Sequence, residues 1–366
     1  MNTPYKALPD HAFWRRVVAA TPPDRIDPVG EAPFRIASTD AVMTAGSCFA
    51  QYIGATLKSM NFNYLVTEPP HSVLSPDLAK DFNYGTFTAR YGNVYTARQL
   101  LQLIERAYSR FTPQEDVWIE ADGRVVDPFR PQIQPGAFLS RREFDIDRAR
   151  HFSAVRQAFE SLDVLVFTLG LTEAWVSKSD GAVFTLCPGV AGGAFDPSRH
   201  VFRNFTVTEV VEDMLAFIDA LKRVNERAKV VLTVSPVPLM ATARPETHVL
   251  SATTYSKAVL RVAAETVSAA RPNVAYFPAY EIIMSRAYFD GSYFSADRRN
   301  VVAKGVAHVM RVFADCFAGA AIADVRSSLP EQPAAPTTGL EAVELLMSVH
   351  CDEAALDPDR PAAVAT

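Results

Sequence analysis

Apolar runs of strand length alternate with segments of helical periodicity along most of the chain. The continuous apolar runs at residues 41–46, 163–170 and 229–234 are typical of strands buried on both faces of a parallel sheet. Two shorter segments, 61–66 and 274–277, predict further strands. Apolar residues recur at helical spacing over 49–60, 97–111, 148–161, 206–225, 255–270 and 301–317. A hairpin is predicted over 117–127, around Asp122-Gly123.

This order of elements predicts repeated βαβ units. We therefore expect an α/β fold of one domain, with a doubly wound, mostly parallel sheet between two helical layers, as in flavodoxin-like proteins. The domain is assigned to residues 34–325. Residues 1–33 are interpreted as an N-terminal extension, and residues 326–366 as a Pro- and Ala-rich, weakly ordered C-terminal tail.

The composition argues against several kinds of binding partner. Lys and Arg total 36 against 41 Asp and Glu, without a basic block, which argues against nucleic acid. Apolar runs are shorter than the about 18 residues of a membrane span, and no signal peptide is evident. The four cysteines lack CxxC or metal-ligand spacing, so we expect no zinc site and a cytoplasmic protein with reduced thiols. Cys187, Cys316 and Cys351 carry no motif and are treated as structural.

The first predicted strand ends in Gly46-Ser47-Cys48, and a helix follows at once. A helix N-terminus stabilises negative charge, so this turn suits a thiolate at Cys48 or an oxyanion held by backbone amides. The alternative is an ordinary βα turn, in which Ser47 caps the helix and Cys48 is a small buried hydrophobe.

Polar or turn-forming residues also follow the other predicted strands, at Gly170–Trp175 and Ser235–Pro238. Because ligands of open α/β sheets bind at the carboxyl ends of the strands, these segments are expected to converge with Cys48 on one site. No metal is implied, since neither a carboxylate cluster nor a Gly-rich phosphate loop is present, and phosphoryl chemistry is disfavoured for the same reason.

The three segments together resemble the GSCFA domain family, which is grouped with the SGNH/GDSL hydrolase superfamily. The resemblance runs from Phe34 to Phe317. It implies an SGNH-hydrolase-like fold, with Cys48 in the place of the nucleophile and Ser47 in the place of the aspartate of Gly-Asp-Ser. Ser47 stays open as the alternative nucleophile.

The resemblance also implies an oxyanion hole. Its donors would be the backbone N–H of Cys48, the glycine of Asn83-Tyr84-Gly85, and a side chain in the superfamily's Gly-x-Asn-Asp motif. That motif reads Gly170-Leu171-Thr172-Glu173 here, so Thr172 stands where an asparagine is usual. A hydroxyl would then serve in place of an amide.

The superfamily's Asp-x-x-His motif, which supplies the catalytic base, reads Asp297-Arg298-Arg299-Asn300. Asparagine cannot act as a general base, so either another residue does or a thiolate needs none. His248 is the first candidate and His71 the second. His308 ranks third, because helical periodicity places it on the solvent face.

Other residues near these motifs have two interpretations each. Glu173 is either an acid/base or, preferably, the cap of a following helix, and Trp175 is expected to form the wall of the substrate pocket. Arg298 and Arg299 either neutralise an anionic group such as a coenzyme A phosphate or form a solvated loop.

The function expected from these residues is acyl-ester hydrolysis or O-acyl transfer through a thioester on Cys48. The substrates would be small-molecule or glycan acyl esters and acceptors, with acyl-CoA as a candidate donor and no other cofactor. The alternative is a non-catalytic ligand-binding protein on a degenerate SGNH scaffold, which Thr172 and Asn300 favour.

Overall fold

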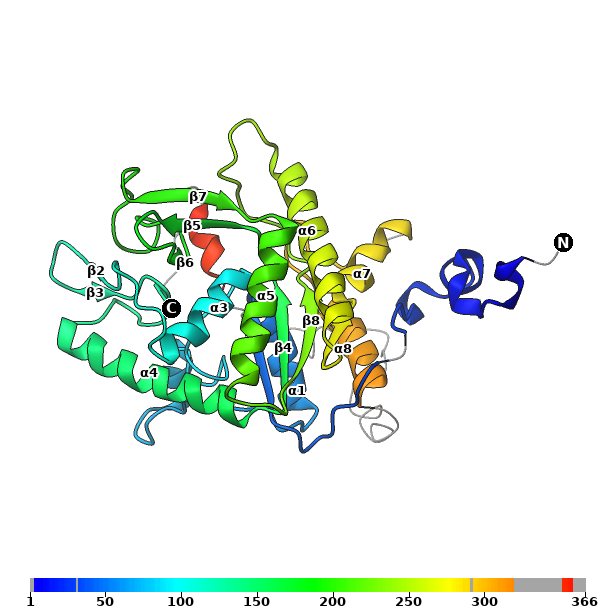
Figure 1. The fold of residues 1–366 in the computed structure, drawn as a ribbon, viewed down its shortest axis with the longest axis horizontal. Helices are drawn as coiled ribbons and strands as arrows, with labels where there is room; N and C mark the ends of the chain where they lie inside the picture. The colour runs from blue at the N-terminus through cyan, green and yellow to red at the C-terminus, as the bar shows by residue number, and fades with distance from the viewer. Residues whose placement is uncertain (1–2, 31, 290–291, 319–350, 358–366) are drawn as a thin grey trace.

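A four-stranded parallel sheet forms the centre of the molecule (Figure 1). The computed structural model describes residues 3–30, 32–289, 292–318 and 351–357. The strands lie in the order β1-β4-β8-β9. Their bounds are β1 Val42–Gly46, β4 Val164–Leu169, β8 Lys229–Val234 and β9 Val274–Phe277.

The predicted strand at 61–66 is reduced to one parallel bridge, in which Tyr64 pairs with Val42. Tyr64 lies beside β1 on the edge away from β4, since Val42 exchanges backbone hydrogen bonds with Asn63 and Leu65. Across the sheet the order is Tyr64, β1, β4, β8, β9. Along the chain, β1 comes first, the Tyr64 bridge second, and β4, β8 and β9 follow. This order is that of flavodoxin-like sheets, whose ligands bind where the direction of winding reverses, next to β1.

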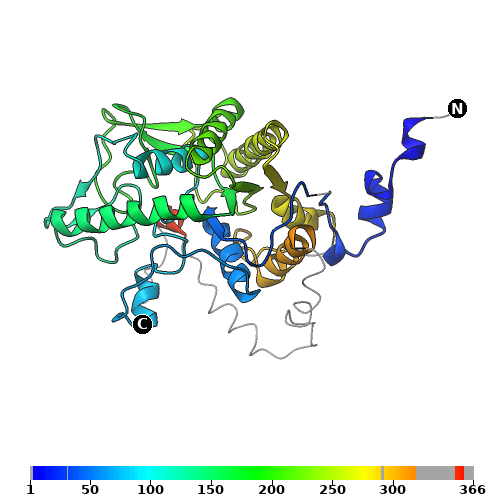
Figure 2. The same ribbon diagram turned by 60° about the horizontal axis from the view of Figure 1, so that its bottom comes forward.

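Alternate side chains of each strand enter different cores. In β4, Leu165 and Phe167 face one core while Val164 and Val166 face the other. Both faces are covered by helices, as Figure 2 shows, which makes this a three-layer α/β fold. The first core is covered by α3 (Ala97–Ala107), α5 (Val207–Lys222) and α6 (Val249–Ala270), and the second by α1 (Cys48–Ser59), α7 (Ala279–Met284) and α8 (Ala303–Phe317).

A smaller antiparallel sheet, ordered β6-β5-β7, continues the chain beyond β4. Its strands are β5 (Glu173–Ser177), β6 (Val183–Phe184) and β7 (His200–Asn204). The predicted hairpin is present as β2 (Trp118–Ile119) and β3 (Val125–Val126). The remaining helices are α2 (Pro76–Asp81) and α4 (Arg141–Ser161), with short helical turns at η1 (Pro4–Ala7), η2 (Asp10–Ala12), η3 (Arg15–Ala19), η4 (Pro23–Arg25), η5 (Ser285–Tyr288) and η7 (Asp352–Leu356).

One further prediction differs from the structure. Glu173 begins a strand and not a helix cap, because β5 pairs along its length with β7. Of the predicted tail at 326–366, only residues 351–357 are described, and Asp352 and Glu353 among them are buried against the domain. The rest of that tail lies outside the described residues.

Close approach of two strand ends shapes the edge of the sheet where β1 stops. Gly46 has a φ of 140°, and a Cβ there would lie 2.4 Å from the Thr168 carbonyl oxygen. A Cβ on Gly170 would lie 2.9 Å from the Cβ of Ser47. The turns after β1 and β4 lie so close to each other that only glycine fits at these two positions.

Candidate functional site

Cys48 is the first residue of α1, at the carboxyl end of β1. Its side chain is buried, with 5% of the residue exposed. Ser47 occupies the N-cap position, yet its side chain makes no capping hydrogen bond, and the hydroxyl is buried without a partner among the described residues. The first amides of α1 have no carbonyl four residues earlier within the helix, and they point toward this end of the sheet. Ser47 and Cys48 therefore lie at a helix N-terminus, as the sequence predicted.

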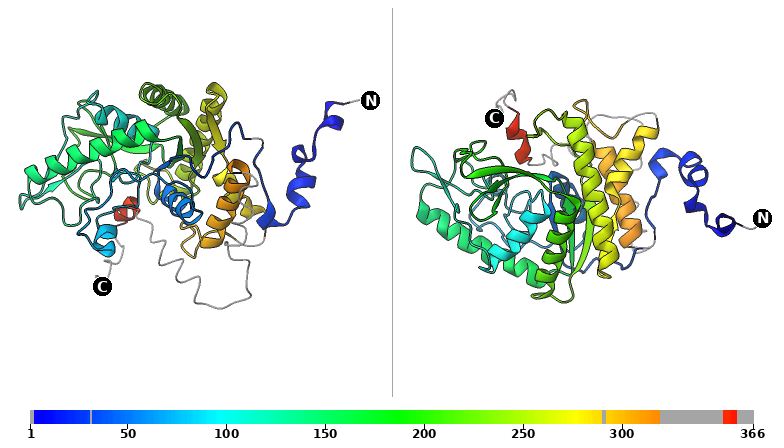
Figure 3. Two further views of the ribbon diagram at one scale, coloured as in Figure 1. Left: turned by 90° about the horizontal axis from the view of Figure 1, so that it is seen from below. Right: turned by 45° about the horizontal axis from the view of Figure 1, so that its top comes forward.

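The segment Cys351–Asp357 closes this end of the sheet. Figures 1 and 3 show it in red beside the smaller sheet and α3, although it comes from the far end of the sequence. Cys351 packs against the core cluster that contains Cys48, and a hydrogen bond between the two thiols is the largest cause of the pKa shift of each. The Asp352 carboxylate accepts a hydrogen bond of 2.8 Å from Asn93, whose amide oxygen accepts one of 2.9 Å from Gln51 in α1. The second thiol is thus placed against the candidate nucleophile.

Arg299 joins this segment to the loop before α8. Its guanidinium nitrogens lie 3.8 Å from the Cys351 sulfur, and Nη2 donates to Glu353 Oε2 at 2.9 Å. The other carboxylate oxygen of Glu353 accepts from the Met240 amide at 3.4 Å. Arg299 is therefore a partner of the site and not part of a solvated loop, whereas Arg298 is exposed, as the alternative expected.

Lys257 brings a second cation to the site from α6. It is 1% exposed, and its Nζ donates to the Gly170 carbonyl at 2.7 Å. Burial lowers the pKa of Lys257 to about 8, although the negative charges of Glu353 and Cys48 oppose this shift. Near neutral pH both the ammonium and the amine are accessible, which is the condition for proton transfer by a lysine.

The two thiols titrate as a pair. The hydrogen bond from Cys48 lowers the pKa of Cys351 to about 6, and Arg299 contributes to the shift. The same hydrogen bond, followed by burial, raises the pKa of Cys48 well above its usual value of 9.0. The pair therefore holds one negative charge at neutral pH, shared across the hydrogen bond. Burial raises the pKa of the neighbouring Glu353 to about 7.

A pocket of about 250 Å³ adjoins the closing segment. Its wall is largely apolar and is formed among others by Leu171, Trp175, Phe184, Leu239 and Leu356. Glu353 and Tyr95 supply polar groups. The Tyr95 hydroxyl is buried and has no partner among the described residues. Burial raises the pKa of Tyr95 well above its usual value, so the phenol keeps its proton.

Gly85, expected at the oxyanion hole, and Asn83, expected to bind substrate, lie elsewhere. The Gly85 carbonyl accepts a hydrogen bond from Lys58, near the C-terminal end of α1, whereas Cys48 starts that helix. Asn83 donates to the Gln132 carbonyl at 3.4 Å. The third residue, Thr172, does follow β4, but its hydroxyl donates to Asn204 at 2.6 Å. Glu173 accepts from the hydroxyl of Thr242 at 2.8 Å, and it lines the pocket.

The three candidate bases are bonded elsewhere, and two of them lie at the surface. His71 and His248 are both exposed, and each uses its Nδ1 to accept a backbone N–H two residues later. His248 thereby caps α6. His308 is 3% exposed and hydrogen-bonded to Tyr293 and the Ile26 carbonyl, so the prediction of a solvent-facing His308 was wrong. Periodicity failed because the N-terminal extension covers that side of α8.

Asp297 and Asn300 form an exposed turn in which the Asn300 amide donates to the Asp297 carboxylate. Hydrogen bonds from Ser295 and from the backbone of Arg299 and Asn300 outweigh partial burial and lower the pKa of Asp297 to about 2. These contacts stabilise the loop that presents Arg299 to the closing segment. In the part of the chain described, no histidine hydrogen-bonds to Cys48, and His350 lies outside that part.

A buried ion cluster holds the long loop of residues 67–90 onto α4. Asp147 in α4 accepts 2.7 Å hydrogen bonds from both Arg90 and Arg130, and Glu68 contacts His151 at 2.8 Å. Burial, with the nearby charge of Arg130, lowers the pKa of His151, which stays neutral. The loop is thereby fixed to the scaffold.

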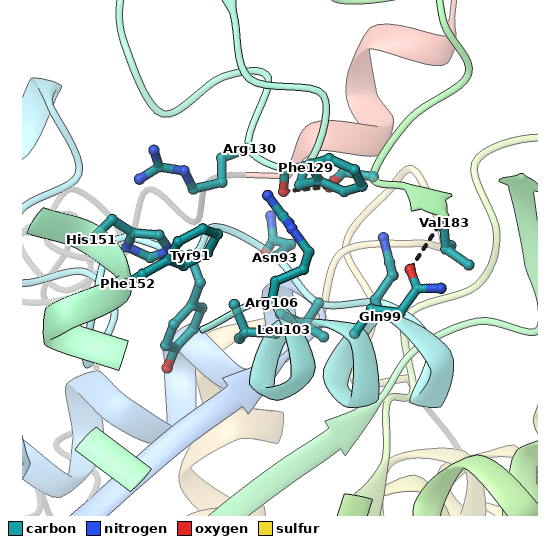
Figure 4. Close-up of a pocket in the computed structure, with 13 residues that line it drawn as sticks. Tyr91, Asn93, Gln99, Leu103, Arg106, Phe129, Arg130, His151, Phe152 and Val183 are labelled. Atoms are coloured by element: carbon teal, nitrogen blue, oxygen red, sulfur yellow. Dashed lines mark hydrogen bonds between the residues drawn. The ribbon is translucent and has the colours of Figure 1, made fainter. Parts of the chain in front are cut away.

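Figure 4 shows that Arg106, Arg130 and His151 surround a cavity beside this cluster. Its volume is about 30 Å³, which holds about two water molecules. The Arg106 guanidinium lies 3.6 Å from the ring centroid of Phe129. The cavity is too small for an acyl substrate, and its charged residues hold the scaffold together.

Within the described residues, no group of three or more His, Cys, Asp or Glu side chains could hold a metal ion. In the same part of the chain, no helix combines the length and apolarity needed to cross a membrane.

The sequence model of the GSCFA family matches residues 41–313, which is most of the chain and includes Cys48, Lys257 and Arg299. No curated protein matches the sequence.

Proposed function

The chain belongs to the GSCFA family, and we propose that it transfers acyl groups through a thioester on Cys48, to water or to an acceptor hydroxyl. The observation that carries this proposal is the position of the Cys48 thiol. It sits at the start of α1, where the winding of the sheet reverses, within a charged site containing Lys257 and Arg299. A thiol in such a setting is suited to nucleophilic attack on an ester or thioester carbonyl.

Lys257 is proposed to perform the proton transfers that a histidine would perform at position 300. In the first step Cys48 gives its proton to the Cys351 thiolate and its sulfur forms a bond to the carbonyl carbon, and the alcohol or thiol of the substrate leaves with a proton from the Lys257 ammonium. In the second step the neutral amine takes a proton from water or an acceptor hydroxyl, which attacks the thioester. The pKa of about 8 at Lys257 supports both directions of transfer.

The oxyanion formed in each step needs hydrogen-bond donors. The amides at the start of α1 supply donors beside the sulfur. The Tyr95 hydroxyl is a further candidate, because it is buried, protonated and unpartnered among the described residues. It would provide the side-chain donor that Thr172 does not supply while bonded to Asn204.

The acyl group is assigned to the pocket of about 250 Å³. Its apolar wall favours an acyl chain over a charged group. Since Cys48 is 5% exposed with residues 351–353 in place, a substrate reaches the sulfur only when that segment moves aside. Acyl transfer is therefore expected to be slower than in an open site.

The test is an activity screen of the reduced protein on nitrophenyl esters and on short acyl-CoA thioesters. We expect Cys48→Ala to lower kcat/KM by about 10³-fold or more, while Ser47→Ala and the matched control Cys316→Ala retain activity. Acylation should appear on the tryptic peptide 36–58, which contains Cys48. Full activity of Cys48→Ala would refute the proposal, and loss in Ser47→Ala alone would assign the nucleophile to Ser47.

A binding protein is the second candidate, favoured by Asn300 in the place of a base and by the closed site. It predicts no turnover of any acyl substrate, together with ligand affinity that is the same in wild type and Cys48→Ala. Isothermal titration with acyl-CoA compounds, run beside the activity screen, separates the two candidates.

A further inference from the structure

Two free cysteines meet at the site although they lie far apart in the sequence. Cys351 packs against the core cluster that contains Cys48, and both thiols are free. We propose that Cys48 and Cys351 are a redox modification site, at which a reversible disulfide caps the nucleophile and fixes residues 351–357 over the pocket.

The surroundings of Cys351 make it the thiol that reacts first with an oxidant. Its side chain is partly exposed, and both terminal nitrogens of Arg299 lie 3.8 Å from its sulfur. A cation at this distance stabilises the thiolate, which is the reactive form. The pKa of about 6 at Cys351 agrees with this arrangement. Cys48 is buried behind it and already hydrogen-bonded, in the position of a resolving thiol.

The other two cysteines provide a contrast within the same chain. Cys187 and Cys316 are partly buried, and no arginine is hydrogen-bonded to either sulfur in the described part of the chain. Burial raises the pKa of each to about 11. They are therefore expected to remain thiols under conditions that oxidise the pair.

The segment that carries Cys351 is already docked, so little rearrangement precedes the bond. Asn93 holds Asp352, and Arg299 with the Met240 amide holds Glu353. These contacts lie directly after Cys351 in the sequence. They keep the two sulfurs together and raise the effective concentration of one thiol at the other.

Hydrogen peroxide is the oxidant class that this chemistry requires. The Cys351 thiolate attacks one peroxide oxygen, the O–O bond breaks, and the departing hydroxide takes a proton to become water, leaving a sulfenic acid. The Cys48 sulfur then attacks the sulfenic sulfur, loses its proton, and the S–O bond breaks to release a second water. Two electrons pass from the sulfurs to the peroxide. A dithiol reductant reverses the bond by thiol exchange.

The experiment treats the reduced full chain with one equivalent of hydrogen peroxide and maps its tryptic peptides without reduction. We expect a linked pair of peptides 36–58 and 327–366, which contain Cys48 and Cys351. The link should vanish on reduction and in Cys48→Ser or Cys351→Ser, and it should persist in Cys316→Ser. Circular dichroism of each variant confirms that it is folded.

The pH dependence of the reaction tests the role of Arg299. In wild type the rate of linkage should reach half its maximum near pH 6, and Arg299→Gln should shift that midpoint toward the usual thiol value of 9.0. A stable sulfenic acid on Cys351 without linkage, or linkage through Cys187 or Cys316, would overturn the proposal. So would an unchanged midpoint in folded Arg299→Gln.

Loss of activity on oxidation rests on the proposed function, whereas the disulfide itself does not. A linked peptide pair together with a reduced protein that turns over no acyl substrate would refute the proposed function alone. Turnover by the reduced protein without any linkage would refute the modification site alone.

Discussion

Replacing Lys257 with methionine should stabilise the fold near neutral pH while it removes acyl transfer. The side chain is fully buried, and its pKa falls from 10.5 to about 8. That shift corresponds to a penalty of about 3 kcal/mol in the free energy of unfolding at neutral pH. Methionine avoids the penalty at similar length. It leaves the Gly170 carbonyl without its 2.7 Å partner, which costs about 1–2 kcal/mol.

The balance favours Lys257→Met by about 1–2 kcal/mol near pH 7. Because the pKa of Lys257 is lower in the folded protein than in the unfolded chain, the penalty on the free energy of unfolding of wild type disappears as the pH rises from about 8 to 10.5. Wild type then gains about 1.4 kcal/mol per pH unit. The advantage of the variant should therefore vanish near pH 9, and above pH 10.5 wild type should be the more stable protein, since the neutral amine still donates to Gly170.

Urea unfolding under reducing conditions, monitored by circular dichroism at several pH values, measures this difference. The matched control is Lys222→Met, which removes an exposed lysine from α5 and should change stability by less than about 0.5 kcal/mol at any pH. A Lys257→Met protein that is less stable than wild type at pH 7, or a stability difference that does not change with pH, would refute the reasoning.

Three further substitutions test the architecture. Gly46→Ala should lower the free energy of unfolding by at least about 3 kcal/mol, read from the urea midpoint, because its Cβ would lie 2.4 Å from the Thr168 oxygen at a φ of 140°. Ser47→Ala removes a buried hydroxyl that has no partner among the described residues, so its melting temperature should stay equal or rise, with a gain in the free energy of unfolding of about 1 kcal/mol at most. His151 has a lowered pKa, so wild-type stability should be complete above its ordinary pKa of 6.5 and fall as the pH drops below that value. Melting temperatures between about pH 5 and pH 8 should show that slope in wild type and lose it in His151→Gln, and an equal slope in both proteins would contradict the assignment.

The spacing of apolar residues predicted the layers of this fold, because the residues that face the core recur at regular intervals along each helix and strand. Every long apolar run became a strand of the parallel sheet, and the helices at 97–107, 207–222 and 249–270 lie where the apolar stripes placed them. The same reasoning placed Cys48 at the edge where the winding reverses, since strand ends converge there in any open sheet.

The partners of Cys48 were missed for two different reasons. Cys351 comes from a short segment whose contacts are all long-range, and nothing in the local pattern of Cys351-Asp352-Glu353 indicates what it packs against. Lys257 did carry a signal, because it lies on the inward stripe of α6 with Leu260 and Ala264. A lysine at such a position is buried, and buried lysines are often functional.

The parallel pairing of β1 with β4 also bears on the order in which the protein assembles. Ala41, just before β1, is held by Asp163, which lies 122 residues later in the sequence. During synthesis this contact can therefore form only after the 122 residues up to Asp163 have been made. The contact between Asn93 and Asp352 spans 259 residues. Contacts of such long range form late in folding. The two thiols are thus expected to meet only after the strands and helices around Cys48 have been made.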